Sequence, residues 1–468
     1  MSPPNDAARI AHPPQQLENL FGYEQACACG RVHRVDLQGA ELASGCLERV
    51  CEWAAHLGAG LSLGLVSDDR TWQVAGERVE RFLKRAGHRV RLCRLVDGAG
   101  GRPHADAESL AFVEREMAGQ DLLVAVGSGT INDLCKLASF NLGRPYLAVA
   151  TAPSMNGYTS AIAAIMRDGV KRTEECHRRM AVIADLDILA AAPAELIASG
   201  LGDLESKPTS TADFRLAGRL RDGYYCSAPE AVVLSAEARV ADAAEAIGRA
   251  EPEAIGLLVE ALLLSGISMK LAGSSSPASG GEHLLSHHWD MLAPLEGRVE
   301  GWHGAQVGVA TIVSSALYES LQEVDPGSLD LDGLVAARPD EETLRRAIRK
   351  RHGPLADQVE AEFFAKHLPG EDLRRELDSI VKGWDELWAV LADVLRPADK
   401  VRGILRAAGA PIRMEDLGLS DEHLRRSFLA AREIRGRFTV LDFAADLGLL
   451  EQLAPRVLSR SGCLSREA

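Results

Sequence analysis

Short apolar runs alternate with longer amphipathic stretches through the first part of the chain. The runs are four to eight residues long and rich in Val, Leu and Ile, which is typical of buried strands, whereas the stretches between them place apolar residues at helical spacing. The predicted strands cover residues 61–66, 90–95, 121–126 and 146–150, and the predicted helices cover 78–86, 107–117 and 130–140. This alternation predicts a parallel sheet with right-handed crossover helices.

The pattern changes in two steps after the fourth strand. Asp168-Gly169 lies between extended residues and predicts a hairpin over 165–172, because this pair favours a tight two-residue turn. A last strand is expected at 180–188. Beyond Pro193, long periodic segments rich in Ala, Leu and Glu predict only helices. We therefore predict an α/β fold with a parallel-sheet domain at 1–195 and an all-helical domain at 196–468.

Composition and charge restrict the class of partner. The chain has 468 residues, a formal net charge of −15 and 46% hydrophobic residues, which is typical of an ordinary globular chain with more than one core. Because this charge repels phosphate backbones and anionic lipid, we expect neither nucleic acid nor a membrane as a partner. A small anionic ligand in a local pocket remains compatible with this net charge. The sequence also allows a homodimer.

The apolar run at 257–267 is interrupted by Glu260 and is shorter than the ~20 residues that a membrane span needs. Residues 1–16 are polar and contain four prolines, unlike a secretory signal. We therefore expect a cytoplasmic protein whose nine cysteines are reduced. Cys27, Cys29 and His33 lie close together, but Cys-x-Cys is a tighter spacing than that of usual zinc pairs, and no second pair lies nearby. Here we predict a hairpin rather than a metal site.

A glycine turn, Gly127-Ser128-Gly129, connects the third predicted strand to the helix that follows. Glycines let the backbone approach a phosphate closely, and a helix N-terminus offers unpaired N–H groups, so the turn is a candidate phosphate site. A tight turn without a ligand fits the same residues. Asp68, just past the first strand, either binds a ribose or caps a helix. The polar segment 151–160 follows the fourth strand, at the edge where open α/β sheets bind ligands.

Histidines cluster in the helical half. Four of the 13 lie between 283 and 303, and His283 and His287 share one face of a helix. Imidazoles that converge with a carboxylate form a divalent-metal site, whereas a polar helix surface is the simpler alternative. Asp203 is a candidate carboxylate, or else a helix cap. The segment 272–281 offers hydroxyl and N–H groups to a phosphate, or is a plain linker.

Together these motifs resemble the glycerol-1-phosphate dehydrogenase family, which is part of the superfamily of dehydroquinate synthase and iron-type alcohol dehydrogenases. The resemblance runs from about residue 61 to 448, and it rests on segments 127–133, 151–160, 202–204, 273–287, 302–304 and 434–441. It implies a Rossmann-like domain that binds NAD or NADP and a helical, dehydroquinate synthase-like domain that holds one divalent metal, usually zinc. The active site would then lie in the cleft between the two domains.

The resemblance also implies individual roles. The metal ligands would be Asp203, His283 and His303, and His287 and residue 156 would face the substrate. The implied cofactor contacts are Asp68, Gly127, Ser128, Gly129, Asp133, Thr151, Ser154 and Ser160. The implied reaction is reversible reduction of dihydroxyacetone phosphate to sn-glycerol 1-phosphate, in which a Lewis acid stabilises the forming alkoxide and His287 or an ordered water supplies the proton.

Two positions depart from the family patterns. Asn156 stands where the family usually has Asp, so an expected charge is replaced by a neutral amide. Lys207 stands where iron-type alcohol dehydrogenases have a fourth ligand, His, which favours a three-ligand site. Three other functions stay open: a reductase of another small phosphorylated or phosphonate carbonyl, a lyase of the dehydroquinate synthase kind that recycles NAD, and a non-catalytic binding module.

Overall fold

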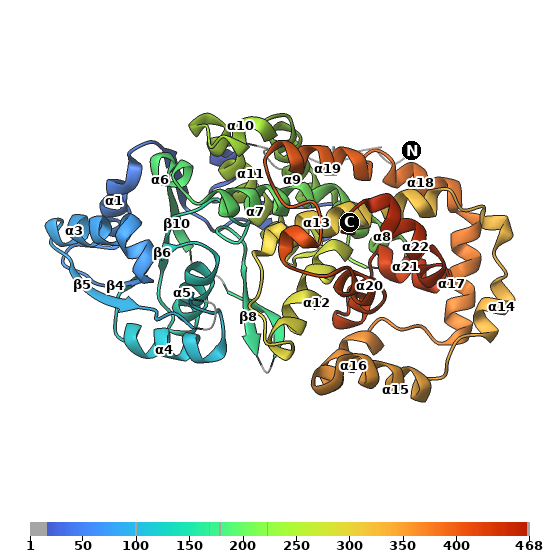
Figure 1. The fold of residues 1–468 in the computed structure, drawn as a ribbon. Helices are drawn as coiled ribbons and strands as arrows, with labels where there is room; N and C mark the ends of the chain where they lie inside the picture. The colour runs from blue at the N-terminus through green and yellow to red at the C-terminus, as the bar shows by residue number, and fades with distance from the viewer. Residues whose placement is uncertain (1–15, 99–100, 168, 177–178, 222, 466–468) are drawn as a thin grey trace, which may run out of the picture.

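The α/β half is built on a six-stranded parallel sheet, as the sequence predicted (Figure 1). The computed structural model describes residues 16–98, 101–167, 169–176, 179–221 and 223–465. In sheet order, the strands are β3 (Gly39–Ala43), β10 (Arg179–Asp185), β7 (Tyr146–Ala150), β6 (Leu122–Gly127), β4 (Ser62–Ser67) and β5 (Arg89–Arg94). Every pairing between neighbours is parallel.

Helices cover both faces of this sheet. Alternate residues of β6 point to opposite faces, so Val124 joins the apolar cluster of α1 (Val50–Ala55) and α3 (Glu77–Arg85). Leu123 lies in the cluster of the other face, with α4 (Ala107–Met117) and α5 (Gly129–Asn141). This double burial explains why β6 is a continuous apolar run rather than an alternating one.

Three elements of this half differ from the sequence prediction. The prediction missed β3, which pairs with β10 at the sheet edge, because its residues Gly-Ala-Glu-Leu-Ala have no β-branched member. The helix predicted at 78–86 starts earlier, with α2 (Asp69–Thr71) and a π-helical turn at Trp72–Gly76. The strand predicted at 180–188 ends at Asp185, whose side chain caps the next helix.

The predicted hairpin is present as β8 (Ile162–Arg167) and β9 (Val170–Glu175), with Arg167 opposite Val170. Gly169 has a φ of 75°, a left-handed conformation that glycine adopts without strain. Asp168, the other half of the predicted turn pair, lies outside the described residues. A smaller hairpin, β1 (Glu24–Ala26) and β2 (Val32–Arg34), confirms the strand start predicted near Cys27.

The rest of the described chain is helical. The helices are α6 (Leu186–Ala190), α7 (Ala194–Glu205), α8 (Lys207–Leu220), α9 (Ser227–Asp242), α10 (Ala244–Gly248), α11 (Pro252–Ala272), α12 (Gly281–Leu295), α13 (His303–Gln322), α14 (Leu331–Ala336), α15 (Glu341–His352), α16 (Ala356–Phe364), α17 (Gly370–Lys382), α18 (Trp384–Leu391), α19 (Ala398–Ala407), α20 (Asp421–Ala430), α21 (Val440–Asp446) and α22 (Leu450–Ser461). The last strand, β10, ends at Asp185 and the first of these helices begins at Leu186, ahead of the boundary predicted between residues 195 and 196. Because one apolar cluster extends through both halves, division into separately folding domains stays a prediction.

Among the described residues, α11 is the one helix long and apolar enough to cross a membrane. Its most apolar window has a mean hydropathy of 1.8, and 78% of that window is buried inside the protein. The helix packs along α9, and residues such as Leu258 and Leu262 lie in the shared core. A helix buried on all sides is apolar all round, so its composition is explained by its place in the core.

Glycines allow a very close crossing of α7 and α13. A Cβ placed on Gly202 would collide with the carbonyl oxygen of Gly304, and one on Gly304 would collide with that of Ser199. Gly200 lies in the same way against the carbonyl oxygen of Pro153, in the loop after β7. These contacts are between backbones, which cannot move aside as a flexible side chain can. Only glycine therefore fits where α7 meets α13 and the loop after β7.

The crossing gives a stability prediction. Gly202→Ala should destabilise the protein by on the order of 1–3 kcal/mol, because the added methyl group forces α7 and α13 apart. Gly403→Ala in α19 is the matched control, since its Cβ would meet nothing within 4 Å. That control should be neutral or stabilising by up to about 1 kcal/mol. Thermal unfolding measures both, and equal midpoints for the two variants would contradict the close crossing.

Candidate active site

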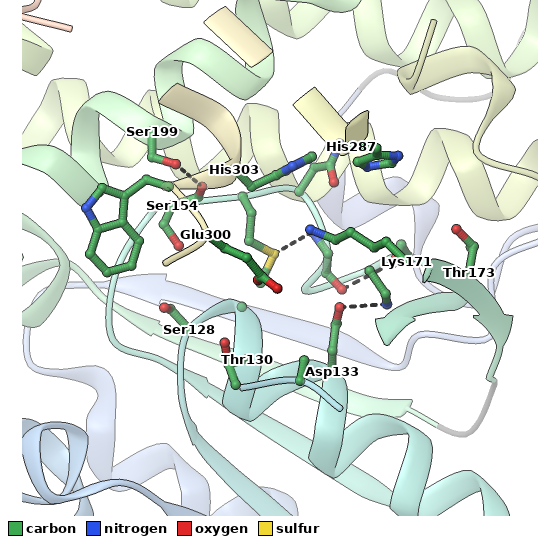
Figure 2. Close-up of a pocket in the computed structure, with 18 of the residues that line it drawn as sticks. Ser128, Thr130, Asp133, Ser154, Lys171, Thr173, Ser199, His287, Glu300 and His303 are labelled. Carbon is green, nitrogen blue, oxygen red and sulfur yellow. Dashed lines mark hydrogen bonds between the residues drawn. The ribbon is translucent and has the colours of Figure 1, made fainter. Parts of the chain in front are cut away.

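A pocket lies between the carboxyl edge of the sheet, the β8–β9 hairpin and the helical half (Figure 2). Ser128, Thr130 and Asp133 line one wall from the start of α5. His287 and His303 line the opposite wall from α12 and α13. The pocket thus joins the two groups of residues that the sequence had indicated separately.

The residues of the predicted phosphate site lie where β6 meets α5. Ser128 is the N-cap of α5 but makes no side-chain cap, so the first N–H groups of the helix are free of the usual side-chain acceptor. Ser128 and Gly129 line the pocket, whereas Gly127 lies below them, packed against Ile131. The first turn of α5 contains no acidic residue, so its positive dipole end is available to an anion.

Asp68 lies at the end of β4, the strand next to β6, so it faces the same crevice as the glycine turn. The structure does use it as a cap: its carboxylate accepts the backbone N–H of Thr71 at 2.7 Å. Its other oxygen accepts Arg70 at 3.3 Å. Asp68 is not among the residues that line the pocket, and neither is Thr151, which is buried at the start of the next loop.

The polar segment 151–160 is tied to both halves. The Tyr158 hydroxyl donates to the carbonyl of Gly127 at 3.2 Å, and the Thr159 hydroxyl donates to that of Leu263 in α11 at 2.5 Å. Ser154 and Ser160, two of the expected cofactor contacts, line the pocket. Some polar side chains of this segment, such as Tyr158 and Thr159, therefore hold the loop in place. Only part of the segment's polar surface remains available to a ligand.

Asp133 also lines the pocket, but its carboxylate is already engaged. It accepts the backbone N–H of Ala164 in β8 at 3.0 Å and forms an ion pair with Lys136 at 3.0 Å. The buried Lys136 ammonium donates in turn to the carbonyls of Gly157 at 2.9 Å and Ile162 at 2.5 Å. Asp133 and Lys136 thus hold the β8–β9 hairpin and the 151–160 segment against α5.

Asp203 comes together with His283 and His303; the two histidines line the pocket, whereas Asp203 is fully buried and is not among its lining residues. One ligand atom from each of them lies within 4.8 Å of the others, and the His283 and His303 ring centroids are 5.3 Å apart. Asp203 lies inside α7 near its end, so it does not cap the following helix, whose N-cap is Ser206. The cap interpretation of Asp203 was therefore wrong, and the convergence with two histidines is observed.

Hydrogen bonds indicate which nitrogen of His283 and of His303 faces the cluster. The Glu282 carboxylate can only accept, so Nδ1 of His283 donates to it at 2.8 Å and the lone pair is on Nε2. Ser286 donates its hydroxyl to Gln306 at 2.9 Å, which leaves its oxygen to accept Nδ1–H of His303 at 3.5 Å. Histidines that bind metals are oriented by outer acceptors in this way.

The gap between these groups fits a cation. The Nε2 of His283 lies 3.6 Å from a carboxylate oxygen of Asp203, and in the neutral ring, with the proton on Nδ1, Nε2 presents a lone pair to that oxygen. Two acceptors that face each other without a proton between them repel unless a positive charge lies between them. One carboxylate and two neutral imidazoles are a usual donor set for a catalytic divalent ion with an open position.

Asp203 is fully buried and compensated on every side. Its oxygens accept Lys207 Nζ at 3.0 Å and the backbone N–H of Asn156 at 3.0 Å. Burial by itself raises the pKa of this carboxyl, but the Lys207 ammonium, the largest opposing influence, holds it well below its ordinary value. Lys207 stands where iron-type alcohol dehydrogenases have a fourth metal ligand, His. Here it pairs with the Asp203 carboxylate instead.

His287 points into the pocket beside the cluster but is not one of its members (Figure 2). Its ring centroid is 5.5 Å from that of His303, and its Nδ1 is buried without a hydrogen-bond partner among the described residues. Burial, and then the Lys171 ammonium, lower the pKa of His287 well below its ordinary value. This imidazole is therefore neutral, and its Nδ1 is not used in a hydrogen bond within the described residues.

Asn156, the departure from the family pattern, faces α11 as well as the pocket. Its side-chain amide donates to the Ser265 hydroxyl at 3.2 Å, while its backbone N–H is bound to Asp203. The residue therefore links the 151–160 segment to both the carboxylate and the core helix. Its side chain contributes no charge to the pocket.

A basic wall adjoins the histidines. Ser275 and Ser279, from the predicted phosphate segment, line both the pocket and a neighbouring cavity that contains Arg435 and Arg437. Arg437 donates to the carbonyl of Ser279 and, at 2.5 Å, to the hydroxyl of Ser275. Burial, and then Arg435, lower the pKa of Arg437 to about 10, so the guanidinium remains charged at neutral pH.

Sequence reasoning missed several residues of the pocket. Arg437 was inside the motif at 434–441, but the resemblance assigned it no role. Lys171 reaches the pocket from β9, and its ammonium pairs with Asp290 at 2.8 Å. Glu300 and Trp302 come from the loop before α13, and Arg102 lies over the Trp302 ring at 4.4 Å. Scattered polar residues on loops give no periodic signal, so only the fold identifies them.

Comparison with known proteins agrees with this geometry. Residues 41–193 match the family model described as iron-containing alcohol dehydrogenase. A Halalkalibacterium halodurans protein named glycerol-1-phosphate dehydrogenase (NAD(P)+) is 32% identical over 417 residues, 89% of this chain and 94% of that protein. A protein of the same name from Thermococcus sibiricus is 34% identical over 58% of this chain and 75% of its own length.

Solved structures support the fold alone. A probable glycerol dehydrogenase from Sinorhizobium meliloti has a TM-score of 0.56 at 18% identity and covers 90% of this chain and 98% of its own. Glycerol dehydrogenase from Schizosaccharomyces pombe has a TM-score of 0.55 at 16% identity, covering 92% and 93%. From the sequence relationship, the chain belongs to the glycerol-1-phosphate dehydrogenase family, whose members are NAD(P)-dependent oxidoreductases that act on CH–OH groups.

Proposed function

We propose that this protein interconverts dihydroxyacetone phosphate and sn-glycerol 1-phosphate with NAD or NADP and a divalent metal, most simply Zn²⁺. The observation that carries the proposal is that the Asp203, His283 and His303 ligand atoms lie within 4.8 Å of one another, where the two histidines line a pocket beside a helix N-terminus and a basic wall. The relatives from Halalkalibacterium halodurans and Geobacillus stearothermophilus carry the name of this activity. The proposed compartment is the cytoplasm.

The cofactor would lie across the crevice at the ends of β4 and β6. The first N–H groups of α5, at Ser128 and Gly129, would bind its pyrophosphate, and Asp68 is placed at the neighbouring strand end to accept a ribose hydroxyl. When bound, its nicotinamide donates or accepts the hydride. Ser154 and Ser160 lie on the pocket wall between this crevice and the histidines.

Asp203, His283 and His303 would hold the divalent ion. When bound, the ion acts as a Lewis acid for the substrate oxygen that becomes an alkoxide. Glu282 keeps the inward nitrogen of His283 unprotonated, and Ser286 does the same for His303, so the donor set stays ready for a cation. Lys207 and the Asn156 N–H fix the orientation of the carboxylate.

His287 would carry the proton. Its neutral ring lines the pocket with its centroid 5.5 Å from that of His303, on the side where the substrate hydroxyl would lie next to the ion. In the oxidation direction the imidazole accepts the hydroxyl proton, and in the reduction direction it returns that proton. The Arg437, Ser275 and Ser279 wall would hold the phosphate and so orient the carbon that reacts.

Steady-state kinetics test the function. The protein should reduce dihydroxyacetone phosphate with NADH or NADPH, lose this activity after metal removal, and regain it when Zn²⁺ is added. His283→Ala should lower kcat/KM by about a hundredfold or more, because two ligands hold the ion poorly. Metal-replete protein with no turnover on this substrate, while other ketones or aldehydes react, would contradict the proposed substrate.

Replacing Arg437 tests the phosphate wall. Arg437→Met should raise the KM for dihydroxyacetone phosphate about tenfold to a hundredfold, since a charge-assisted bond contributes about 1.5–3 kcal/mol. Turnover of phosphate-free dihydroxyacetone should hardly change. Arg425→Met, at an exposed position of α20, is the matched control. Equal losses on both substrates would show that Arg437 only supports the loop.

Asn156→Asp tests whether the departure from the family pattern sets the substrate. The Ser265 hydroxyl that now accepts the amide hydrogen can turn and donate to a carboxylate, so the loop should keep its conformation. We expect activity on dihydroxyacetone phosphate to be kept or increased. A large loss of activity on dihydroxyacetone phosphate, with activity retained on another phosphorylated or phosphonate carbonyl, would favour that alternative substrate class. The neutral side chain of Asn156 is the observation that supports this alternative.

A further inference from the structure

Four metal-binding side chains meet far from the active-site cluster. Cys27, Cys29 and His33 come from the β1–β2 hairpin, and Cys226 is the N-cap of α9, 193 residues after His33. One donor atom of each lies within 4.8 Å of the others. The sequence predicted no metal site here, because the Cys-x-Cys spacing is tight and no second pair of ligands lies nearby in sequence. The fold brings Cys226, a fourth donor, from the helical half.

The distances match a tetrahedron around one ion. With bonds of about 2.3 Å to sulfur and 2.0 Å to nitrogen, the edges of a tetrahedral zinc site are about 3.8 Å between sulfurs and 3.5 Å between sulfur and nitrogen. The Sγ atoms of Cys27 and Cys226 are 3.7 Å apart. His33 Nε2 lies 3.5 Å from Cys29 Sγ and 3.4 Å from Cys226 Sγ.

The orientation of His33 is a second, independent observation. Its side chain is buried, and its Nδ1 lies 2.7 Å from the carbonyl oxygen of Leu271. A carbonyl can only accept, so Nδ1 carries the proton, and the lone pair of Nε2 points at the sulfurs. A carbonyl behind a ligating histidine is the usual device that fixes this tautomer in metal sites.

A disulfide does not account for the cluster. The 3.7 Å between Cys27 and Cys226 is far longer than the ~2.05 Å of a sulfur–sulfur bond, and Cys27, Cys29 and Cys226 form no disulfide in the structure. A disulfide would also leave Cys29 and the inward lone pair of His33 without a role. Two smaller features suit thiolate ligands: the Ala228 N–H points at the Cys226 sulfur at 3.4 Å, and Gly30, with a φ of 83°, turns the hairpin between the ligands.

We propose that Cys27, Cys29, His33 and Cys226 bind a second, structural Zn²⁺. Three thiolates and one imidazole are a soft donor set that selects this ion, and four protein ligands leave no open position for catalysis. On binding, the three thiols release their protons to the solvent. The site is separate from the proposed catalytic ion and does not depend on the proposed substrate.

The ion would join the N-terminal hairpin to the start of α9, and the hairpin in turn contacts the C-terminal end of α11. Arg31, between the ligands, donates to the carbonyl of Ala272 at 2.9 Å and lies over the Tyr224 ring at 3.5 Å. Leu271 and Ala272 end α11, immediately before the segment that carries Ser275 into the pocket. The ion would thus fix the C-terminal end of α11 from outside the active site.

Metal analysis of the full-length protein tests the site. In a His283→Ala background, which weakens the catalytic site, about one zinc should remain per chain, because a closed four-ligand site keeps its ion through dialysis. Adding Cys226→Ser should remove that zinc. Adding Cys51→Ser, at a half-buried cysteine outside the cluster, should leave it. Retention of zinc in the Cys226→Ser protein, or its absence from His283→Ala alone, would overturn the proposal.

The wild-type protein gives a test that needs no variant. A strong chelator under native conditions should expose thiols of the cluster to Ellman's reagent and release zinc in step with them, since the catalytic ligands include no cysteine. With Co²⁺ in place of zinc, the site should show the charge-transfer absorption of a cobalt–thiolate centre. Thiol reactivity that is the same with and without chelator, or a Cys27–Cys226 crosslink in non-reduced peptides, would overturn the proposal.

Discussion

The buried carboxylate of Asp203 is the constraint on which the rest of the site depends. An ionised carboxylate with no exposed surface costs several kcal/mol unless charges and hydrogen bonds compensate it. Lys207 from α8, the Asn156 N–H from the loop after β7, and His283 from α12 all lie around it. Because these partners come from separate parts of the chain, satisfying one charge aligns the sheet edge with the helical half.

The glycines of α7 make this arrangement possible. Gly200 lets the loop after β7 lie against the helix, and Gly202 lets α13 do the same one residue before Asp203. Any larger residue would hold His303 and Asn156 away from the carboxylate. The backbones of α7, α13 and the loop after β7 are thus in direct contact, with no long side chains between them. The histidine side chains face the pocket instead. The chemistry at this site therefore follows from packing in the helices behind it.

Much of the fold and of the site could be predicted from the sequence, and the limits have physical reasons. Buried strands such as β6 and β7 are recognisable as apolar runs, and the i, i+4 pair His283 and His287 indicates a shared helix face. The order of motifs along the chain was enough to indicate the family. Two kinds of information were out of reach: edge strand β3, which has no strong strand formers, and contacts between distant segments, such as Cys226 with the hairpin or Lys171 with the pocket.

The proposal that Asp203, His283 and His303 hold one divalent ion in the pocket between the two halves is the basis of the proposed chemistry. Anomalous diffraction at the absorption edge of the bound metal tests it most directly. We expect a peak about 2.0–2.2 Å from an Asp203 oxygen and from Nε2 of both histidines, with His287 outside bonding distance. Metal-replete crystals without a peak among these three residues would contradict it.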